Sequence, residues 1–179
     1  MPNPQPNKPA PAYDVLVIGG GPAGTTMASC LVEKGWSVGL IEKAVHPRFH
    51  IGESLLPRNM PILERLGVLE QVANIGIAKY AAEFNSQVTA AEQDVFYFSH
   101  AADKTFTHAY EVRRSEFDEI LFRNATAKGV STFEGMTVKE GELADQTHVV
   151  RVLAASGARR RHRPCSRRES AAVPGAGGR

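Results

Sequence analysis

Residues 15–43 read VLVIGGGPAGTTMASCLVEKGWSVGLIEK, and they are the most informative stretch of this sequence. A short β-branched run over residues 13–18 ends at three glycines, which is typical of a buried strand. Pro22 can open the following helix, because the first helical turn needs no N–H donor at that position. Residues 38–41, VGLI, predict a second strand. The unit has the length of about 30 residues that a parallel βαβ crossover requires.

The glycines of this stretch fit the pattern G-x-G-x-x-G, which is specific when it follows a strand and opens a helix. Gly19 allows a tight turn, Gly21 lets the backbone approach a pyrophosphate, and Gly24 permits close packing of helix on strand. The helix N-terminus offers free N–H groups and the positive end of its dipole to that anion. Glu42 ends the second strand and is placed to accept hydrogen bonds from adenosine ribose hydroxyls, where its charge would repel the 2′-phosphate of NADP. A glycine turn without a ligand is the ordinary alternative.

The chain has 179 residues, about the length of one domain, and a formal net charge of +2. We expect no transmembrane helix and no secretory signal, since the apolar runs are short. Two widely spaced cysteines predict no disulfide framework, and the six histidines show no metal-ligand spacing. These features predict a cytoplasmic protein without a metal or a membrane partner. Ser54 lacks a G-x-S-x-G setting, which argues against a hydrolase.

Three regions differ in composition. Residues 1–12 are rich in proline and are expected to form a disordered arm. Residues 13–156 carry the alternating apolar patterns of a folded domain. Residues 157–179 contain seven arginines and one glutamate, and are expected to form a basic disordered tail.

Outside the βαβ unit, residues 43–57 are expected to form a loop. The remaining elements predicted by periodicity are helices at 55–66, 68–73 and 115–128, and strands at 81–88, 95–99, 105–112, 130–135, 136–141 and 148–153. The expected fold class is therefore α/β: a Rossmann-like FAD/NAD(P)-binding domain with a parallel sheet and accessory antiparallel strands.

Four stretches resemble FAD-dependent oxidoreductases of the aromatic-hydroxylase and flavin-dependent, tryptophan-halogenase-like group. They are the βαβ stretch itself, PRFHIGESLLP at 47–57, GIAKYAAEF at 76–84 and YEVRRSEFD at 110–118. The resemblance covers residues 13–153, the N-terminal part of such a protein. The glycine pattern is common to many flavoproteins, whereas PRFHIGESLLP is much more selective.

The resemblance implies an FAD cofactor and a halogenase or monooxygenase reaction on an organic, aromatic substrate. Lys79 matches the catalytic lysine of the halogenases, although a lysine in a strand is more often a solvent-facing residue. The implied partners are that substrate and a source of reduced flavin or NAD(P)H. The residues expected to bind FAD are Gly19, Gly21, Pro22, Ala23, Gly24, Glu42, Lys43, Arg48, Ser54 and Arg113.

The basic segment 157–179 does not match what the resemblance leads one to expect there. Members of the group continue with a strand, an Asp-Ala-Ser-Gly-like turn and a substrate domain. We therefore expect a truncated, incomplete FAD domain with an out-of-frame tail and little activity of its own. Two alternatives remain open: a non-catalytic dinucleotide-binding module, and a nucleic-acid-binding protein that uses its basic tail.

Overall fold

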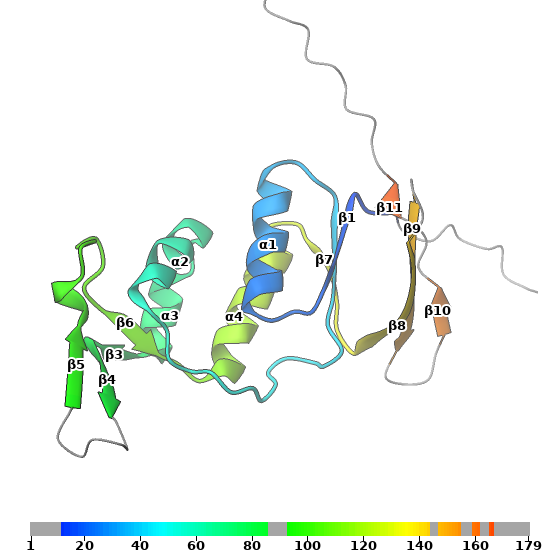
Figure 1. Ribbon diagram of the computed structural model, residues 1–179. Coiled ribbons are helices and arrows are strands. Elements are labelled where there is room, and N and C mark those ends of the chain that lie inside the picture. Colours follow the sequence, from blue (N-terminus) through cyan, green and yellow to red (C-terminus); the bar gives the residue numbers. More distant parts are fainter. Residues whose placement is uncertain (1–11, 86–92, 144–146, 155–158, 162–164, 167–179) are drawn as a thin grey trace, which may run out of the picture.

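The computed structural model describes residues 12–85, 93–143, 147–154, 159–161 and 165–166. Figure 1 shows the parallel sheet in the centre-right of the molecule, two long helices beside it, and antiparallel sheets toward both ends. The proline-rich arm predicted for 1–12 lies, except for its last residue, outside the described residues.

The predicted βαβ unit is present. It consists of β1 (Val15–Ile18), α1 (Pro22–Glu33) and β2 (Val38–Ile41), with β1 and β2 parallel. A third strand, β7 (Ser131–Phe133), pairs in parallel with β2, so the sheet order is β1-β2-β7. Every residue of β2 is buried, as expected for the central strand of a covered parallel sheet. α1 packs on this sheet and against α4 (Arg114–Ala127), which runs beside it (Figure 1).

The middle of the chain forms a second, mainly apolar unit to the left of α1 and α4 in Figure 1. Its helical elements are η1 (Pro57–Asn59), α2 (Met60–Leu66), α3 (Leu69–Ile75) and η2 (Phe98–His100). Its strands form two antiparallel pairs, β3 (Ile77–Lys79) with β6 (Ala109–Glu111) and β4 (Ala81–Asn85) with β5 (Gln93–Tyr97).

Several predicted boundaries differ in this unit. The strand expected over 95–99 is Gln93–Tyr97 and is followed by the 3₁₀ turn Phe98–His100, and the helix expected over 68–73 is Leu69–Ile75. The helix expected from residue 55 begins at Pro57, because Leu56 precedes a proline and is extended, with φ −118° and ψ 156°. The Leu55 N–H donates to the carbonyl of Tyr110 (3.0 Å) and ties this extended segment to β6. The strand expected over 105–112 is only Ala109–Glu111. Its first part is a bend in which the Thr105 N–H donates to Asp103 Oδ1 at 2.9 Å.

Two clusters of buried apolar side chains form the core, and α4 contributes to both. Phe117 and Leu121 pack with α2 and α3, while Phe122 and Ala125 pack with α1 and β2. The helix therefore joins the parallel sheet to the middle unit.

The last strands form a separate antiparallel sheet on the other side of the parallel sheet from α1 (Figure 1). β8 (Met136–Leu143) pairs with β9 (Thr147–Ala154), and β9 also pairs with the short β10 (Arg159–Arg161) and β11 (Cys165–Ser166). The last two strands lie in the segment that we expected to lack regular structure. A strand edge offers backbone N–H and C=O groups to any sequence, so pairing there does not need apolar residues. The remainder of 157–179 lies outside the described residues.

Within the described part of the chain, no helix is long and apolar enough to cross a membrane. Across those same residues, no three histidine, cysteine or acidic side chains are grouped so that they could hold a metal ion.

Candidate functional site

A tight glycine turn joins β1 to the N-terminus of α1. Gly19 has φ +105°, and its N–H donates to the carbonyl of Ile41 at 2.8 Å. A Cβ at Gly24 would lie 2.0 Å from the Gly19 carbonyl oxygen, so only glycine allows this approach of helix to strand. Helix α1 has no side-chain N-cap and no acidic residue in its first turn. Its first N–H groups are therefore free to bind an anion, as the sequence predicted.

Glu42 lies directly behind this turn, at the end of β2, and is only 4% exposed. Its Oε2 accepts the N–H of Gly20 at 2.7 Å, and its Oε1 accepts the N–H of Ala44 at 2.9 Å. Burial raises the pKa of Glu42, but these two donors and the nearby Arg48 outweigh it and hold the pKa below its ordinary value. The carboxylate thus ties the turn to the loop after β2. Each oxygen keeps a second lone pair for another donor.

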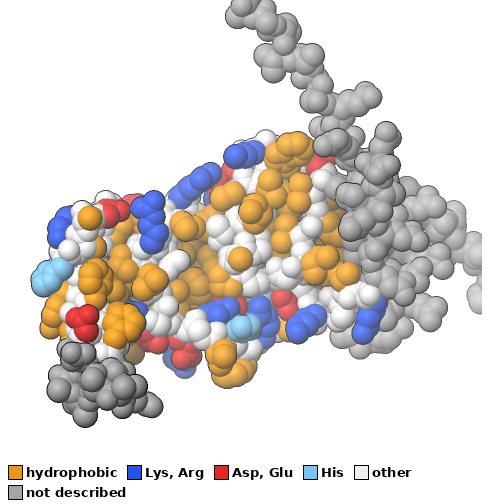
Figure 2. Space-filling model, viewed as in Figure 1, with side chains coloured by type: hydrophobic (Ala, Val, Ile, Leu, Met, Phe, Trp, Pro, Cys, Tyr) orange, Lys and Arg blue, Asp and Glu red, His pale blue; other side chains and the backbone are white. Residues whose placement is uncertain are grey.

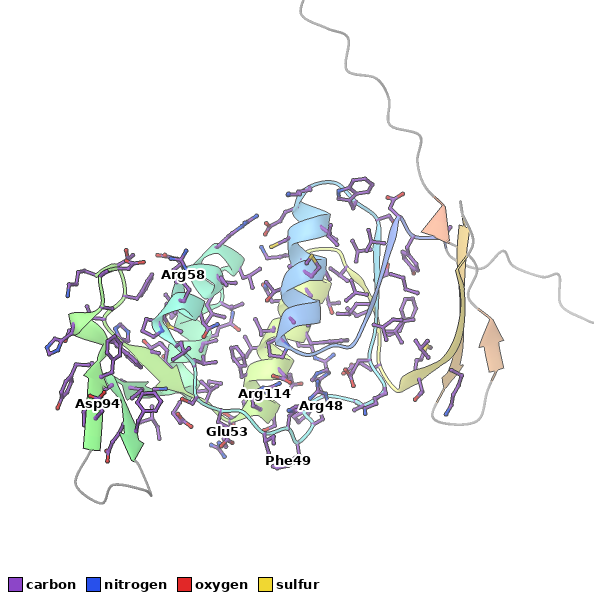
Figure 3. The ribbon with its side chains drawn as sticks, viewed as in Figure 1. Arg48, Phe49, Glu53, Arg58, Asp94 and Arg114 are labelled. Atoms are coloured by element: carbon purple, nitrogen blue, oxygen red, sulfur yellow. The ribbon has the colours of Figure 1, made fainter. Side chains whose placement is uncertain are left out.

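Arg48 reaches back from the 43–57 loop to the same place (Figure 3). Its side chain is 15% exposed, with Nε 3.5 Å from Glu42 Oε1 and Nη1 3.1 Å from Asp118 Oδ2. Both of these nitrogens are buried, yet neither makes a well-oriented hydrogen bond to the described residues. A Cβ on Gly21 would lie 3.6 Å from Arg48 Nη2, which places the guanidinium beside the glycine turn. The Arg48 guanidinium is therefore a positive charge beside the glycine turn that still has N–H donors available for hydrogen bonds.

The two arginines before α4 point in different directions. Arg113, the predicted FAD contact, is 77% exposed and pairs with Glu116 at 3.1 Å. Arg114 is 12% exposed and donates from Nε and Nη2 to the two oxygens of Asp118, at 2.7 and 3.0 Å. Its Nη1 donates to the carbonyl of Ile51 at 2.6 Å. Neither Arg114 nor Asp118 was among the predicted site residues, although their i,i+4 spacing on a predicted helix is a signal for such a pair.

Lys79 and Ser54 lie together, at a distance from the glycine turn. Lys79 Nζ donates to Ser54 Oγ and to the carbonyl of Leu55, the latter at 3.0 Å, and lies 5.4 Å from the centre of the Phe98 ring. Figure 1 shows β3, which carries Lys79, on the far side of α4 from the parallel sheet. Lys43, another predicted cofactor residue, is exposed.

Two cavities adjoin these groups. One of about 500 Å³ is bordered by Pro22 and Ala23 of the turn, by Gly52, and by Arg114, with apolar residues of α1, α2 and α4 completing it. The other, of about 360 Å³, lies at the middle unit. Its walls are mainly apolar and aromatic, among them Leu56, Pro57, Phe84, Phe96, Phe98 and Phe106. Figure 2 shows hydrophobic side chains at the surface of this end of the molecule.

A buried histidine that we did not predict as functional supports the loop that carries Arg48. The backbone N–H and Nδ1 of His46 both lie 2.8 Å from Glu134 Oε1, and Arg123 donates to Glu134 Oε2 at 2.7 Å. Burial raises the pKa of Glu134, but the contacts with His46 and Arg123 hold it below the ordinary value. Residues 46 and 134 are 88 positions apart, so no local sequence pattern indicates this pair.

Comparison with known proteins gives the family. The chain matches the model of the FAD binding domain over residues 12–163. It is 41% identical over 129 residues to a tryptophan 2-halogenase of Chondromyces crocatus, covering 72% of this chain and 24% of that one.

Solved structures agree with this match. A flavoprotein/dehydrogenase from Cytophaga hutchinsonii has a TM-score of 0.77 at 34% identity, and the alignment covers 86% of this chain and 37% of that chain. The myxobacterial chondrochloren halogenase has a TM-score of 0.76 at 32% identity, covering 86% and 36%.

This chain therefore belongs to the FAD-binding domain family, and its curated relatives are flavin-dependent halogenases. The resemblance inferred from the sequence, the α/β fold class and the FAD cofactor are confirmed. The chain spans about a quarter of the length of the curated relatives it matches. The family match ends at residue 163, beyond the boundary at 156 that we predicted for the domain.

The glycine turn fits the FAD that this family binds. The turn has no side chains at Gly19, Gly20 and Gly21, and the helix N-terminus behind it has no side-chain cap. Arg48 has buried donors that make no hydrogen bond within the described part of the chain. A diphosphate could approach the glycines closely, accept hydrogen bonds from the free N–H groups of the helix and pair with the Arg48 guanidinium.

Proposed function

We propose that this chain forms the dinucleotide-binding part of a flavin-dependent halogenase or monooxygenase that acts on an organic, aromatic substrate. The observation that carries the proposal is the juxtaposition of the glycine turn, the uncapped end of α1 and the Arg48 guanidinium. FAD, when bound, supplies the redox chemistry, because reduced flavin delivers electrons to dioxygen. The protein binds the cofactor, orients it and excludes water.

In this proposal the diphosphate of FAD lies on the backbone N–H groups of Ala23 and Gly24, which follow Pro22 at the start of α1, and on Arg48. Glu42 accepts hydrogen bonds from the ribose through the lone pairs that Gly20 and Ala44 leave unused. Lys43 is exposed next to that position and contributes a positive charge. Arg113 contributes its charge from the exposed start of α4.

Lys79 is the proposed catalytic residue, and Ser54 is its neighbour on the segment that approaches the flavin. The ammonium group is held by Ser54 and by the carbonyl of Leu55, next to a mainly apolar cavity of about 360 Å³ of which Phe98 is one wall. A positioned ammonium beside an apolar cavity suits the transfer of oxidised halogen to an aromatic ring. The proposed partners are an organic, aromatic substrate and a source of reduced flavin or NAD(P)H. The proposed location of the protein is the cytoplasm.

Titration with FAD tests the cofactor site. Gly21→Val should abolish binding, since its branched side chain fills the approach to the turn. Glu42→Ala should weaken binding by about 1–3 kcal/mol, the cost of leaving polar groups unpaired. Arg58→Gln is a matched control, because Arg58 is 85% exposed and pairs with Asp103 outside the site. Unchanged FAD affinity in both site variants would refute the assignment.

The two other functions considered from the sequence are less well supported. If the chain were a non-catalytic module, it would bind FAD but would not convert a substrate. An assay for product with reduced FAD, halide and oxygen distinguishes this module from the proposed enzyme. A nucleic-acid-binding tail predicts retention on heparin that depends on residues 157–179. The match to the FAD-binding domain extends to residue 163, into the basic segment, and does not favour a nucleic-acid-binding role for that segment.

A further inference from the structure

Asp118 is a completely buried carboxylate in the second turn of α4. Its Oδ1 lies 2.7 Å from Arg114 Nε, and its Oδ2 lies 3.0 Å from Arg114 Nη2 and 3.1 Å from Arg48 Nη1. A charge without solvent is tolerated only when it is paired in this way. The aspartate therefore joins two arginines that belong to different segments of the chain.

Both arginines hold the same short loop. Arg48 is its first residue, and Arg114 donates to the carbonyls of Ile51 and Gly52 at 2.6 and 3.4 Å. The segment 48–52 is thus fastened at both ends to one carboxylate on α4. Figure 3 shows Arg48 and Arg114 close together at the lower edge of the molecule.

We propose that Asp118 is a positioning residue for the cofactor site, and that it acts by holding the Arg48 guanidinium beside the glycine turn. This inference rests on the function proposed above. Among the residues that the structure describes, the one other carboxylate within ion-pair range of Arg48 is that of Glu42, at 3.5 Å. Without Asp118, Arg48 loses the carboxylate that lies 3.1 Å from its Nη1, and its planar guanidinium is no longer held in one orientation toward a diphosphate.

Asp118 does not line the cavity beside the turn, and it has no exposed surface. It therefore cannot contact FAD itself. A role through Arg48 and a purely structural role make different predictions when the two residues are changed together.

The experiment is a double-mutant cycle on FAD affinity, measured by quenching of flavin fluorescence. Arg48→Gln should raise the Kd by about 10- to 100-fold, the range for a lost charge-assisted hydrogen bond. Asp118→Asn should raise it by about tenfold. If Asp118 acts through Arg48, the double variant binds no more weakly than Arg48→Gln alone. Asp103→Asn is the matched control, since it makes the same change in an exposed pair with Arg58 outside α4, and it should leave the Kd unchanged.

Additive losses in the double variant, with normal binding by the wild type, would overturn this inference and leave the proposed function intact. Failure of the wild type to bind FAD would overturn both. If Asp118→Asn does not fold, Arg48→Lys replaces it. That variant keeps the charge and the Arg114–Asp118 pair but lacks the planar fork. It should bind FAD about tenfold more weakly, and wild-type affinity would overturn the inference.

Discussion

Alanine at Gly24 should destabilise the folded domain, whereas alanine at Gly21 should change stability little. A Cβ at Gly24 would lie 2.0 Å from the Gly19 carbonyl oxygen and 3.3 Å from Val17 Cγ1. The Gly19 carbonyl belongs to the backbone and cannot rotate away, so α1 would have to move off β1. A Cβ at Gly21 meets the flexible end of Arg48 at 3.6 Å, an ordinary contact.

The size of the effect follows from two opposing contributions. An extra carbon in a packed contact costs about 1–3 kcal/mol, and the short approach to a backbone atom puts Gly24→Ala near about 3 kcal/mol. Replacing glycine by alanine within a helix returns about 1 kcal/mol. The net loss is therefore about 2 kcal/mol, which lowers the Tm of a chain of this size by about 4–8 °C. At Gly21, the residue before the helix, alanine costs at most about 1 kcal/mol.

Thermal unfolding of the wild type and both variants, followed by far-UV circular dichroism, measures this difference. FAD titration of the same samples separates the effect on stability from the effect on binding. The Gly21→Ala side chain should hinder the approach of the FAD diphosphate to the turn without disturbing the helix. A Tm for Gly24→Ala equal to that of the wild type would refute the packing argument. So would a Gly21→Ala variant that melts as low as Gly24→Ala.

Three further predictions concern the charged groups. Glu42→Gln leaves one backbone N–H without its acceptor and should cost about 1–3 kcal/mol in urea unfolding at neutral pH. The pKa of Glu42 is lowered in the folded protein, so its contribution to the free energy of unfolding is present above the ordinary pKa of 4.5 and is lost as the pH falls through the folded pKa. The difference in stability between wild type and variant should therefore shrink on acidification. A difference that stays constant with pH would contradict this. Arg113→Gln should change the free energy of unfolding by less than about 0.5 kcal/mol, because its ion pair is exposed. Arg114→Gln removes hydrogen-bond donors from the buried Asp118 and should cost about 3–5 kcal/mol. Equal effects would mean that the two side chains are not oriented as described. Lys79→Met should change the Kd for FAD by less than about threefold, or about 0.7 kcal/mol, because Ser54 and Leu55 hold Lys79 on the far side of α4 from the parallel sheet. It should abolish the halogenated product that the wild type forms, and weakened FAD binding would place the ammonium in the cofactor site instead.

The part of the fold that could be predicted is the part built from local patterns. The glycine turn, α1 and the two strands around it follow from residues that are adjacent in the sequence, each with a steric or hydrogen-bonding reason to be there. The helix at 114–127 was recognisable for the same reason, from its apolar spacing. Boundaries failed where a long-range contact holds extended backbone next to a helix, as where Leu55 bonds to Tyr110 just before Pro57.

The candidate site was only partly predictable, because its geometry depends on how distant segments pack. Arg113 and Arg114 are equivalent in sequence, and only the packing of α4 determines which of them turns inward. The family resemblance indicated Arg48, but its neighbour Asp118 is 70 positions away and looks like an ordinary helix residue in the sequence. Glu42 was expected to face a ligand, and the additional use of its oxygens by two backbone N–H groups has no sequence signature.

Helix α4 has a consequence for how the domain unfolds. Its Phe117 and Leu121 belong to one hydrophobic cluster, and its Phe122 and Ala125 belong to the other. Neither cluster can lose its packing while this helix stays folded and buried against it, and the helix cannot unwind without opening both clusters. The parallel sheet and the middle unit are therefore thermodynamically coupled and should melt in one cooperative transition, with calorimetric and van't Hoff enthalpies that agree.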